Sequence, residues 1–201
     1  RVGAVLYGSQ VDGVLPPGAT RVHVLNLLQR MRAPRKAGPK GQGTALADLL
    51  KTAAGVIKRR SLVFVVSDFI SAPGWQQAIQ RLSLRHEVVA VRLFDPLEMA
   101  LPDVGLVTVE DAETGEQLLV DGNDAAFRQR FAQQAQDREA ALLDSLVQAG
   151  VDCLELNTDE ALDQALLRFA QLRKRASQLS TGGRAAPVGS LRSIQAGRVH
   201  A

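Results

Sequence analysis

Hydrophobic positions along this chain follow two patterns that alternate with each other. Short apolar runs rich in β-branched residues, such as the Leu-Val-Phe-Val-Val run at 62–66, show no polar alternation. Runs of this kind are typical of strands that are buried on both faces in a parallel sheet. Between the runs, apolar residues recur at helical spacing, as in Leu46, Leu49, Leu50 and Ala53. The chain is therefore predicted to alternate strands with amphipathic helices.

The predicted strands lie at 1–7, 10–15, 62–66, 87–93 and 151–156, and a two-stranded excursion lies at 104–109 and 117–120, with its turn at 113–115. The predicted helices begin at Thr20, at Thr44, after Pro73, at Asn123 or Asp124 and at Asp159, and the last of them ends near residue 175. Pro16, Pro17 and Gly18 are expected to close the second strand.

This order predicts an α/β fold with a doubly wound, mostly parallel sheet and a β-hairpin insertion. Residues 1–175 form the predicted domain. From 176 to 201 the chain is mainly Gly, Ser, Ala and Arg, and we predict a disordered basic tail there.

Charge is distributed unevenly along the 201 residues, although the net charge is only +3. Residues 1–60 carry 11 basic and 2 acidic side chains, whereas residues 61–175 carry 10 basic and 19 acidic ones. Such opposed charge suits either attraction between the two halves or docking on another charged surface. The single Cys153 excludes an intramolecular disulfide framework, which favours a reducing compartment, and we expect a cytoplasmic location.

Asp68 is the first candidate for a functional side chain, because it follows the apolar run at 62–66 and ligands collect at the carboxyl ends of parallel strands. A haloacid-dehalogenase phosphatase would need a second aspartate two residues later, where Ile70 stands. The three histidines are poorly placed for a Ser-His-Asp triad with Asp68: His86, for example, precedes a strand and so lies at the opposite edge of the sheet. A dinucleotide-binding turn is not indicated either, since the glycines between 38 and 43 follow a helix.

A site for a hard cation fits the pattern better. Thr44 at a helix start and Asp68 at a strand end should both lie on the carboxyl edge, and their oxygens suit Mg²⁺ or Mn²⁺. The alternative is structural: Thr44 would be an N-cap, and Asp68 would bond backbone amides of its own loop. The local pattern alone leaves both interpretations open.

Two segments, Gly-Thr-Ala-Leu-Ala-Asp-Leu-Leu at 43–50 and Leu-Val-Phe-Val-Val-Ser-Asp-Phe at 62–69, resemble the later part of a von Willebrand factor A-like domain. Further segments recur in order: Arg-His-Glu-Val-Val-Ala-Val-Arg at 85–92, Asp-Pro-Leu-Glu at 95–98, Leu-Pro-Asp-Val-Gly at 101–105 and Leu-Glu-Leu-Asn-Thr-Asp at 154–159. Together they resemble the bacterial proteins called domain of unknown function 58, over residues 2–175.

The resemblance implies a metal-ion-dependent adhesion site, in which the second-loop threonine corresponds to Thr44 and the third-loop aspartate to Asp68. The first loop, an Asp-x-Ser-x-Ser motif after the first core strand, is expected to precede Arg1, so the domain is expected to be incomplete at its N-terminus. Mg²⁺ or Mn²⁺ is thus expected in the complete domain, while this chain alone would keep at most two side-chain ligands.

The resemblance also implies a protein-interaction domain without enzymatic activity, working with a MoxR-type AAA+ ATPase as partner. Two alternatives come from the residues themselves. One is a metal-dependent hydrolase or phosphatase using Asp68, although no second acid or general base stands near it in the sequence. The other is nucleic-acid binding through a basic loop formed by Arg30, Arg32, Arg35, Lys36 and Lys40.

Overall fold

A computed structural model describes residues 1–8, 10–33, 45–110 and 117–179 of the chain. In chain order, the elements are β1 (Val2–Tyr7), β2 (Val11–Gly18), α1 (Arg21–Arg32), α2 (Leu46–Val56), β3 (Leu62–Ser67), α3 (Trp75–Ser83), β4 (Glu87–Phe94), the 3₁₀ turn η1 (Pro96–Glu98), β5 (Leu106–Glu110), β6 (Gln117–Asp121), α4 (Ala125–Gln148), β7 (Asp152–Asn157) and α5 (Leu162–Leu179).

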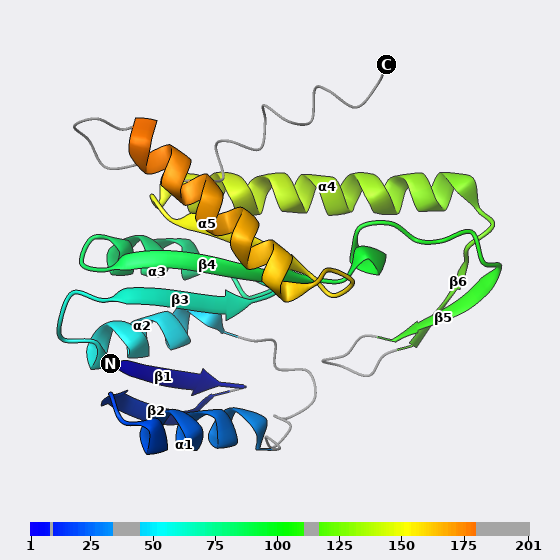
Figure 1. Cartoon of the computed structure of the whole chain (residues 1–201). Coiled ribbons are helices and arrows are strands. Elements are labelled where there is room, and N and C mark those ends of the chain that lie inside the picture. Colours follow the sequence, from blue (N-terminus) through cyan, green and yellow to red (C-terminus); the bar gives the residue numbers. More distant parts are fainter. Residues whose placement is uncertain (9, 34–44, 111–116, 180–201) are drawn as a thin grey trace.

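The centre of the fold is a parallel sheet with the strand order β3-β4-β7 (Figure 1). Val63 is paired with Val88, and Val89 with Asp152, so the three strands run in step and end at a common carboxyl edge. Helix α3 connects β3 to β4, and α4 returns the chain from the β5–β6 hairpin to β7. The two parallel connections therefore each contain a helix, as this topology requires.

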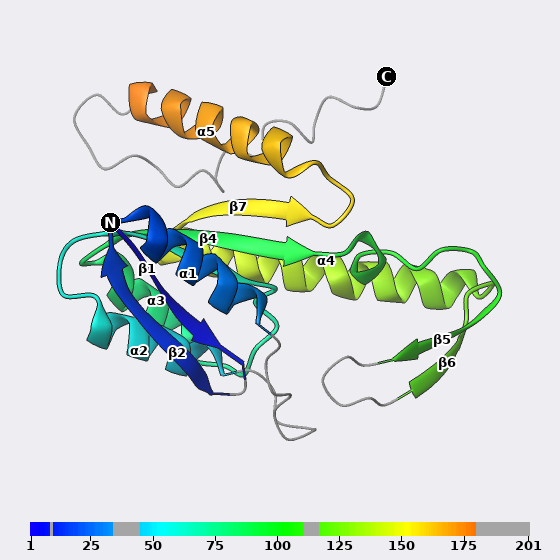
Figure 2. The same ribbon diagram turned by 60° about the horizontal axis from the view of Figure 1, so that its bottom comes forward.

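Helices cover both faces of the sheet, as Figure 2 shows, with α5 on one side and α2, α3 and α4 on the other. On β4, Val88 and Ala90 belong to the large core formed with these three helices. The alternate residues Val89 and Val91 pack in a smaller core that includes Phe169 of α5. Because both sets are buried, β4 reads as a continuous apolar run. The predicted α/β class, with a parallel sheet, flanking helices and an antiparallel hairpin, is confirmed.

Strand β3 differs from the sequence prediction, because only one of its faces is buried. Val63 and Val65 pack in the large core, whereas Phe64 and Val66 are 55% and 56% exposed. The physical reason is its position. β3 is the outer strand of the sheet, and within the described residues its free edge pairs with no other strand.

The strands β1 and β2 form a separate antiparallel pair that lies beyond the β3 side of the sheet (Figure 1). β2 runs on to Gly18, so Pro16 and Pro17 lie inside the strand instead of closing it. The register is irregular between Val2 and Ala4, opposite the two prolines. A strand at a sheet edge tolerates proline at such an irregularity, because no ladder hydrogen bond is needed there.

Helix α1 begins as predicted, with the Thr20 hydroxyl accepting a hydrogen bond from the His23 N–H at 3.2 Å. Its apolar residues are less buried than their spacing indicates, since Leu27 alone among them is buried while Leu25 and Leu28 are exposed. The main contacts of the helix are with β1 and β2, and this small pair of strands leaves much of its apolar side uncovered.

The β5–β6 hairpin and the long helix α4 were both predicted. Asp124 is the N-cap of α4 and accepts the N–H groups of Ala126 and Phe127 at 2.9 and 3.0 Å. After the helix, Gly150 adopts a left-handed conformation with φ 67°, which glycine adopts at low cost. Helix α5 begins at Leu162 and not at Asp159, which lies in the turn that follows β7.

Several predicted features lie outside the described residues: Thr44, the hairpin turn at 113–115, most of the basic loop and the tail from residue 180. Helix α5 itself extends to Leu179, four residues beyond the predicted end of the domain. Among the helices of the described part, none combines the length and the apolar character needed to cross a bilayer.

Candidate functional site

Each strand of the parallel sheet ends in a turn built on a short polar side chain. Asp68 follows β3, Asp95 follows β4, and Asn157 is the last residue of β7. In all three turns the side-chain oxygen accepts the backbone N–H two residues later, at 2.9 to 3.0 Å. Aspartate and asparagine favour such turns, because their side chains can replace a backbone acceptor.

Among the side chains of these three turns, the Asp68 carboxylate has an oxygen without a hydrogen-bond partner in the described residues. Its Oδ1 accepts the Ile70 N–H at 3.0 Å and the Ser67 hydroxyl at 3.3 Å. Its Oδ2 has no hydrogen-bond partner within the described part of the chain, and the side chain is exposed. Asp68 therefore has one oxygen fixed in its loop and a second one free to bind a ligand.

The backbone immediately after Asp68 is strained. Phe69 has φ 62° and is the one residue other than glycine with a positive φ in the described chain. Its ring is buried and meets the Trp75 ring edge-on, with 5.4 Å between the centroids. Burial of this ring, together with a 3.0 Å hydrogen bond from the Phe69 N–H to the Ser67 hydroxyl, holds the unfavourable conformation. Such strain is concentrated at functional sites.

The same loop is joined to the start of α2. Ser71 Oγ accepts the Leu46 N–H at 2.9 Å. The N-cap residue of α2 is Ala45, whose side chain makes no capping hydrogen bond, so Ser71 satisfies a helix N–H from a different element. The amino end of α2, where the partial charge of the helix is positive, thus lies beside the loop of Asp68.

The other two turns are bonded to each other. The Thr158 hydroxyl donates to Asp95 Oδ2 at 3.4 Å, and the Thr158 N–H donates to the Phe94 carbonyl at 3.1 Å. Both Asp95 oxygens are thus engaged, since its Oδ1 also caps η1. Of the two aspartates that build these turns, Asp68 is therefore the one with an open carboxylate oxygen.

Glu160, which follows the β7 turn, is neutralised by an ion pair. Arg168 Nη2 donates a hydrogen bond to Glu160 Oε2 at 2.9 Å, and the side-chain hydrogen bonding of Arg168 to Glu160 is the main factor that raises the pKa of Arg168. Across the described segments, no three His, Cys, Asp or Glu side chains form a group that could hold a metal ion. Within the described residues, the Asp68 carboxylate is therefore the one predicted cation ligand that the structure places.

The structure tests the predicted site only in part. Asp68 lies at the carboxyl edge as predicted. Thr44 lies outside the described residues, but Ala45 and Leu46, which follow it directly, lie beside the Asp68 loop. Helix α2 begins at Leu46, and its N-cap residue is Ala45. The structural alternative had predicted Thr44 at this N-cap position.

Sequence reasoning missed the supporting residues Ser67, Phe69 and Ser71. A serine on either side of Asp68 was a usable signal, because serine hydroxyls in loops commonly bond backbone N–H groups. The positive φ of Phe69 gave no signal, since phenylalanine is an unusual residue for that conformation.

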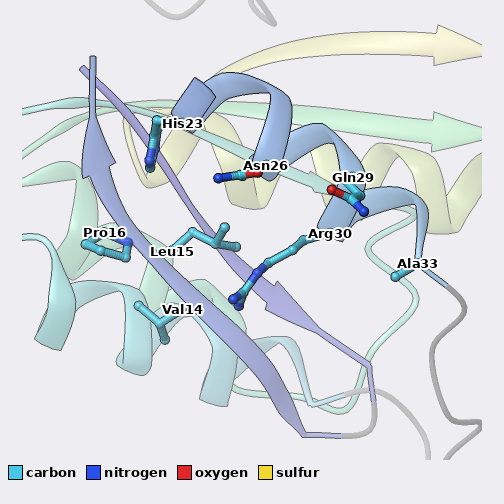
Figure 3. Close-up of a pocket in the computed structure, with 8 residues that line it drawn as sticks. All are labelled: Val14, Leu15, Pro16, His23, Asn26, Gln29, Arg30 and Ala33. Atoms are coloured by element: carbon cyan, nitrogen blue, oxygen red, sulfur yellow. The ribbon is translucent and has the colours of Figure 1, made fainter. Parts of the chain in front are cut away.

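A concave region lies between α1 and β2 (Figure 3). It has a volume of about 600 Å³ and is lined by Val14, Leu15, Pro16, His23, Asn26, Gln29, Arg30 and Ala33. Arg30 reaches from α1 toward β2 in this groove (Figure 3). The His23 Nε2 is bonded to the Val2 carbonyl at 2.8 Å, so this histidine has a structural contact between α1 and β1.

The chain matches the sequence profile of the family described as protein of unknown function DUF58, over residues 1–141. It belongs to this family. The match ends within α4, so β7 and α5 lie beyond it, and the predicted resemblance of the segment at 154–159 stays a prediction.

Relatives with similar sequences come from mycobacteria. The chain is 30% identical over 161 residues to an uncharacterized protein of Mycobacterium avium, covering 79% of this chain and 94% of that one. It is also 30% identical over 179 residues to uncharacterized proteins of Mycobacterium bovis and Mycobacterium tuberculosis, covering 87% of this chain. The chain spans only 55% of the length of these last two relatives.

Solved structures show weaker similarity. A conserved hypothetical protein BatB from Bacteroides thetaiotaomicron matches with a TM-score of 0.47 and 16% identity, over 88% of this chain and 79% of that one. An aerotolerance-related membrane protein from Bacteroides fragilis matches with a TM-score of 0.42 and 16% identity, over 86% and 78% of the two chains.

Proposed function

We propose that this chain forms part of a von Willebrand A-like domain that docks protein partners through a divalent metal ion at the carboxyl edge of its sheet. The domain has no enzymatic role in this proposal. The observation that carries it is the Asp68 carboxylate, which has one oxygen fixed by its loop and the other free. The strained Phe69 beside it supports a functional loop, because a simple turn does not need this conformation.

The metal would be Mg²⁺ or Mn²⁺, since both prefer oxygen ligands. Asp68 Oδ2 is a carboxylate oxygen that could coordinate such an ion. Thr44 precedes Leu46 by two residues in the sequence, and the Leu46 N–H is bonded to Ser71 in the Asp68 loop. One carboxylate and one hydroxyl are too few for tight binding, so further ligands have to come from another segment. A bound cation would leave an open position for an acidic side chain of the partner.

The exposed face of β3 supports the participation of such a segment. Within the described residues, the outer edge of β3 is free and Phe64 and Val66 are exposed, so an additional strand would pair with this edge and the helix after that strand would cover the exposed face. In the proposed domain this strand is the first core strand, and the Asp-x-Ser-x-Ser loop at its end supplies the remaining ligands. The coding sequence upstream of Arg1 is the place to look for it.

The partner that we propose is a MoxR-type AAA+ ATPase, on the basis of the family resemblance. A docking role suits the geometry better than hydrolysis does. Asp95 and Glu160, two of the acids that follow the neighbouring strands, are engaged in a turn and in an ion pair, so within the described residues neither of these two is free to act as a general base.

The test is capture of the MoxR-type ATPase by the whole gene product, in Mg²⁺ and in EDTA. Capture should require Mg²⁺, and the Asp68→Asn variant should lose it. An asparagine Oδ1 can still accept the Ile70 N–H, so the loop is retained while the carboxylate charge is removed. Asp121→Asn is the matched control, because Asp121 also ends a strand, is exposed and accepts an N–H two residues later, from Asn123.

Equal capture by the wild-type protein and by Asp68→Asn would disprove the role given to Asp68. Capture that persists unchanged in EDTA would exclude a metal-mediated contact. Hydrolysis of generic phosphoesters by the wild-type protein, lost in Asp68→Asn, would instead favour the enzymatic alternative.

A further inference from the structure

The amino edge of the parallel sheet, opposite Asp68, carries a group of exposed cations around an exposed leucine. Lys58, Arg59 and Arg60 lie in the loop before β3, and Arg81, Leu84 and Arg85 lie at the end of α3 and in the turn before β4. The Ser61 carbonyl accepts the Glu87 N–H at 2.9 Å and so holds the two loops together. We call these six residues the amino-edge patch.

The positive charge of the amino-edge patch is not compensated locally. In the described segments, none of its five cations has an ion pair or a side-chain hydrogen bond to a carboxylate. Two acids at the same edge, Glu87 and Asp152, are both bonded to Arg173 of α5, with Arg173 Nε 3.0 Å from Asp152 Oδ2. The edge therefore presents a net positive field to an approaching surface.

Leu84 gives this surface its second property. The residue is the C-cap of α3 and is 74% exposed, the largest exposed fraction of any large hydrophobic side chain in the described chain. Exposed positions at helix ends are usually occupied by polar residues, so an exposed leucine between arginines is unusual. Cations that meet lipid headgroups and an apolar side chain that enters the acyl boundary are the features of proteins that bind the surface of an anionic bilayer.

Nucleic acid fits the amino-edge patch less well. Binding to single strands usually depends on exposed aromatic side chains on which bases stack, and Trp75, the aromatic residue of α3, is buried. A phosphate backbone would also leave Leu84 in water, without a partner.

We propose that the amino-edge patch binds the surface of an anionic lipid bilayer, with Leu84 inserted below the headgroups. This arrangement points the carboxyl edge of the sheet, with Asp68, away from the lipid and toward the aqueous phase. It does not depend on the metal-docking proposal, because the two edges share no residues.

Co-sedimentation of the purified chain with vesicles tests the proposal. Binding is expected to vesicles of phosphatidylcholine mixed with phosphatidylglycerol and not to phosphatidylcholine alone, and to weaken with added salt. The double variant Arg59→Ala/Arg60→Ala should bind the anionic vesicles about 25-fold more weakly, at roughly fivefold for each cation. Leu84→Ser should weaken binding by about tenfold, because the apolar contribution is lost.

Matched controls lie elsewhere on the surface. Arg130→Ala/Arg138→Ala removes two exposed arginines of α4, and Leu97→Ser removes an exposed leucine near the carboxyl edge. Both controls should bind the anionic vesicles as the wild-type protein does. Equal binding to neutral vesicles, no binding to anionic vesicles, or an equal loss in the controls would overturn the proposal. Binding to a short DNA duplex that matches vesicle binding and is unchanged by Leu84→Ser would also overturn it and would assign the patch to nucleic acid.

Discussion

Arg92 Nη1 lies 3.1 Å from Glu155 Oε1, across the neighbouring strands β4 and β7, and both side chains are more than nine-tenths buried. The same nitrogen also lies 3.1 Å from Glu139 Oε1 of α4. The guanidinium group is stacked over the Phe94 ring at 4.8 Å from its centroid. One arginine thus joins two strands of the sheet to the helix that covers them.

Removing this arginine should destabilise the fold strongly. Arg92→Leu leaves the Glu155 carboxylate buried without its cation, and we expect the free energy of unfolding to fall by about 3–5 kcal/mol. Urea unfolding monitored by circular dichroism measures the change. The double variant Arg92→Leu/Glu155→Leu should recover much of the loss, because it removes both buried charges. A change below about 0.5 kcal/mol in Arg92→Leu, as at an ordinary surface position, would contradict a structural role for the ion pair.

Two adjacent valines of β3 should respond differently to the same substitution. Val65 is 5% exposed and packs in the large core, so Val65→Ala should lower the free energy of unfolding by about 2 kcal/mol. Val66 points to the uncovered face, so Val66→Ala should cost less than about 0.5 kcal/mol. Thermal unfolding of the two variants compares them directly. Equal losses would mean that both faces of β3 are covered in solution, as expected if an additional strand and helix were bound there.

Ser71 should contribute to stability through the helix that it caps. Ser71→Ala removes the acceptor of the Leu46 N–H, and we expect a loss of about 1 kcal/mol, typical of a lost N-cap. Ser145→Ala is a suitable control, because its hydroxyl bonds a carbonyl within its own helix and α4 should be little affected by its loss. Denaturant unfolding gives both values, and a control as destabilised as Ser71→Ala would argue against the capping role.

The order of strands and helices could be predicted from the sequence because each element carries its own pattern. The apolar run of β4 and the Asp124 cap of α4 each depend only on residues that are neighbours in the sequence, so both can be recognised before the fold is known. The burial of β3 was overestimated, since its run has the same composition as that of β4 and only its outer position in the sheet exposes Phe64 and Val66.

The candidate site was predictable only in its central residue. The position of Asp68 follows from a strand end, whereas its free oxygen depends on which donors the fold brings near. The bond from Leu46 to Ser71 joins residues 25 positions apart, and the pair Arg92–Glu155 joins residues 63 apart. Contacts of this kind depend on the strand register and on the packing of helices, which no local pattern specifies.

Binding of Mn²⁺ at the carboxyl edge tests the central claim most directly. In NMR spectra of the ¹⁵N-labelled whole gene product, small amounts of Mn²⁺ should broaden the amide signals of Asp68 and Ile70 first, because a bound paramagnetic ion relaxes its nearest nuclei most strongly. The Asp121 and Asp95 turns should broaden later, and the Asp68→Asn variant should lose the selective effect. Broadening spread evenly over the exposed carboxylates, or selective broadening that persists in Asp68→Asn, would contradict a metal site at Asp68.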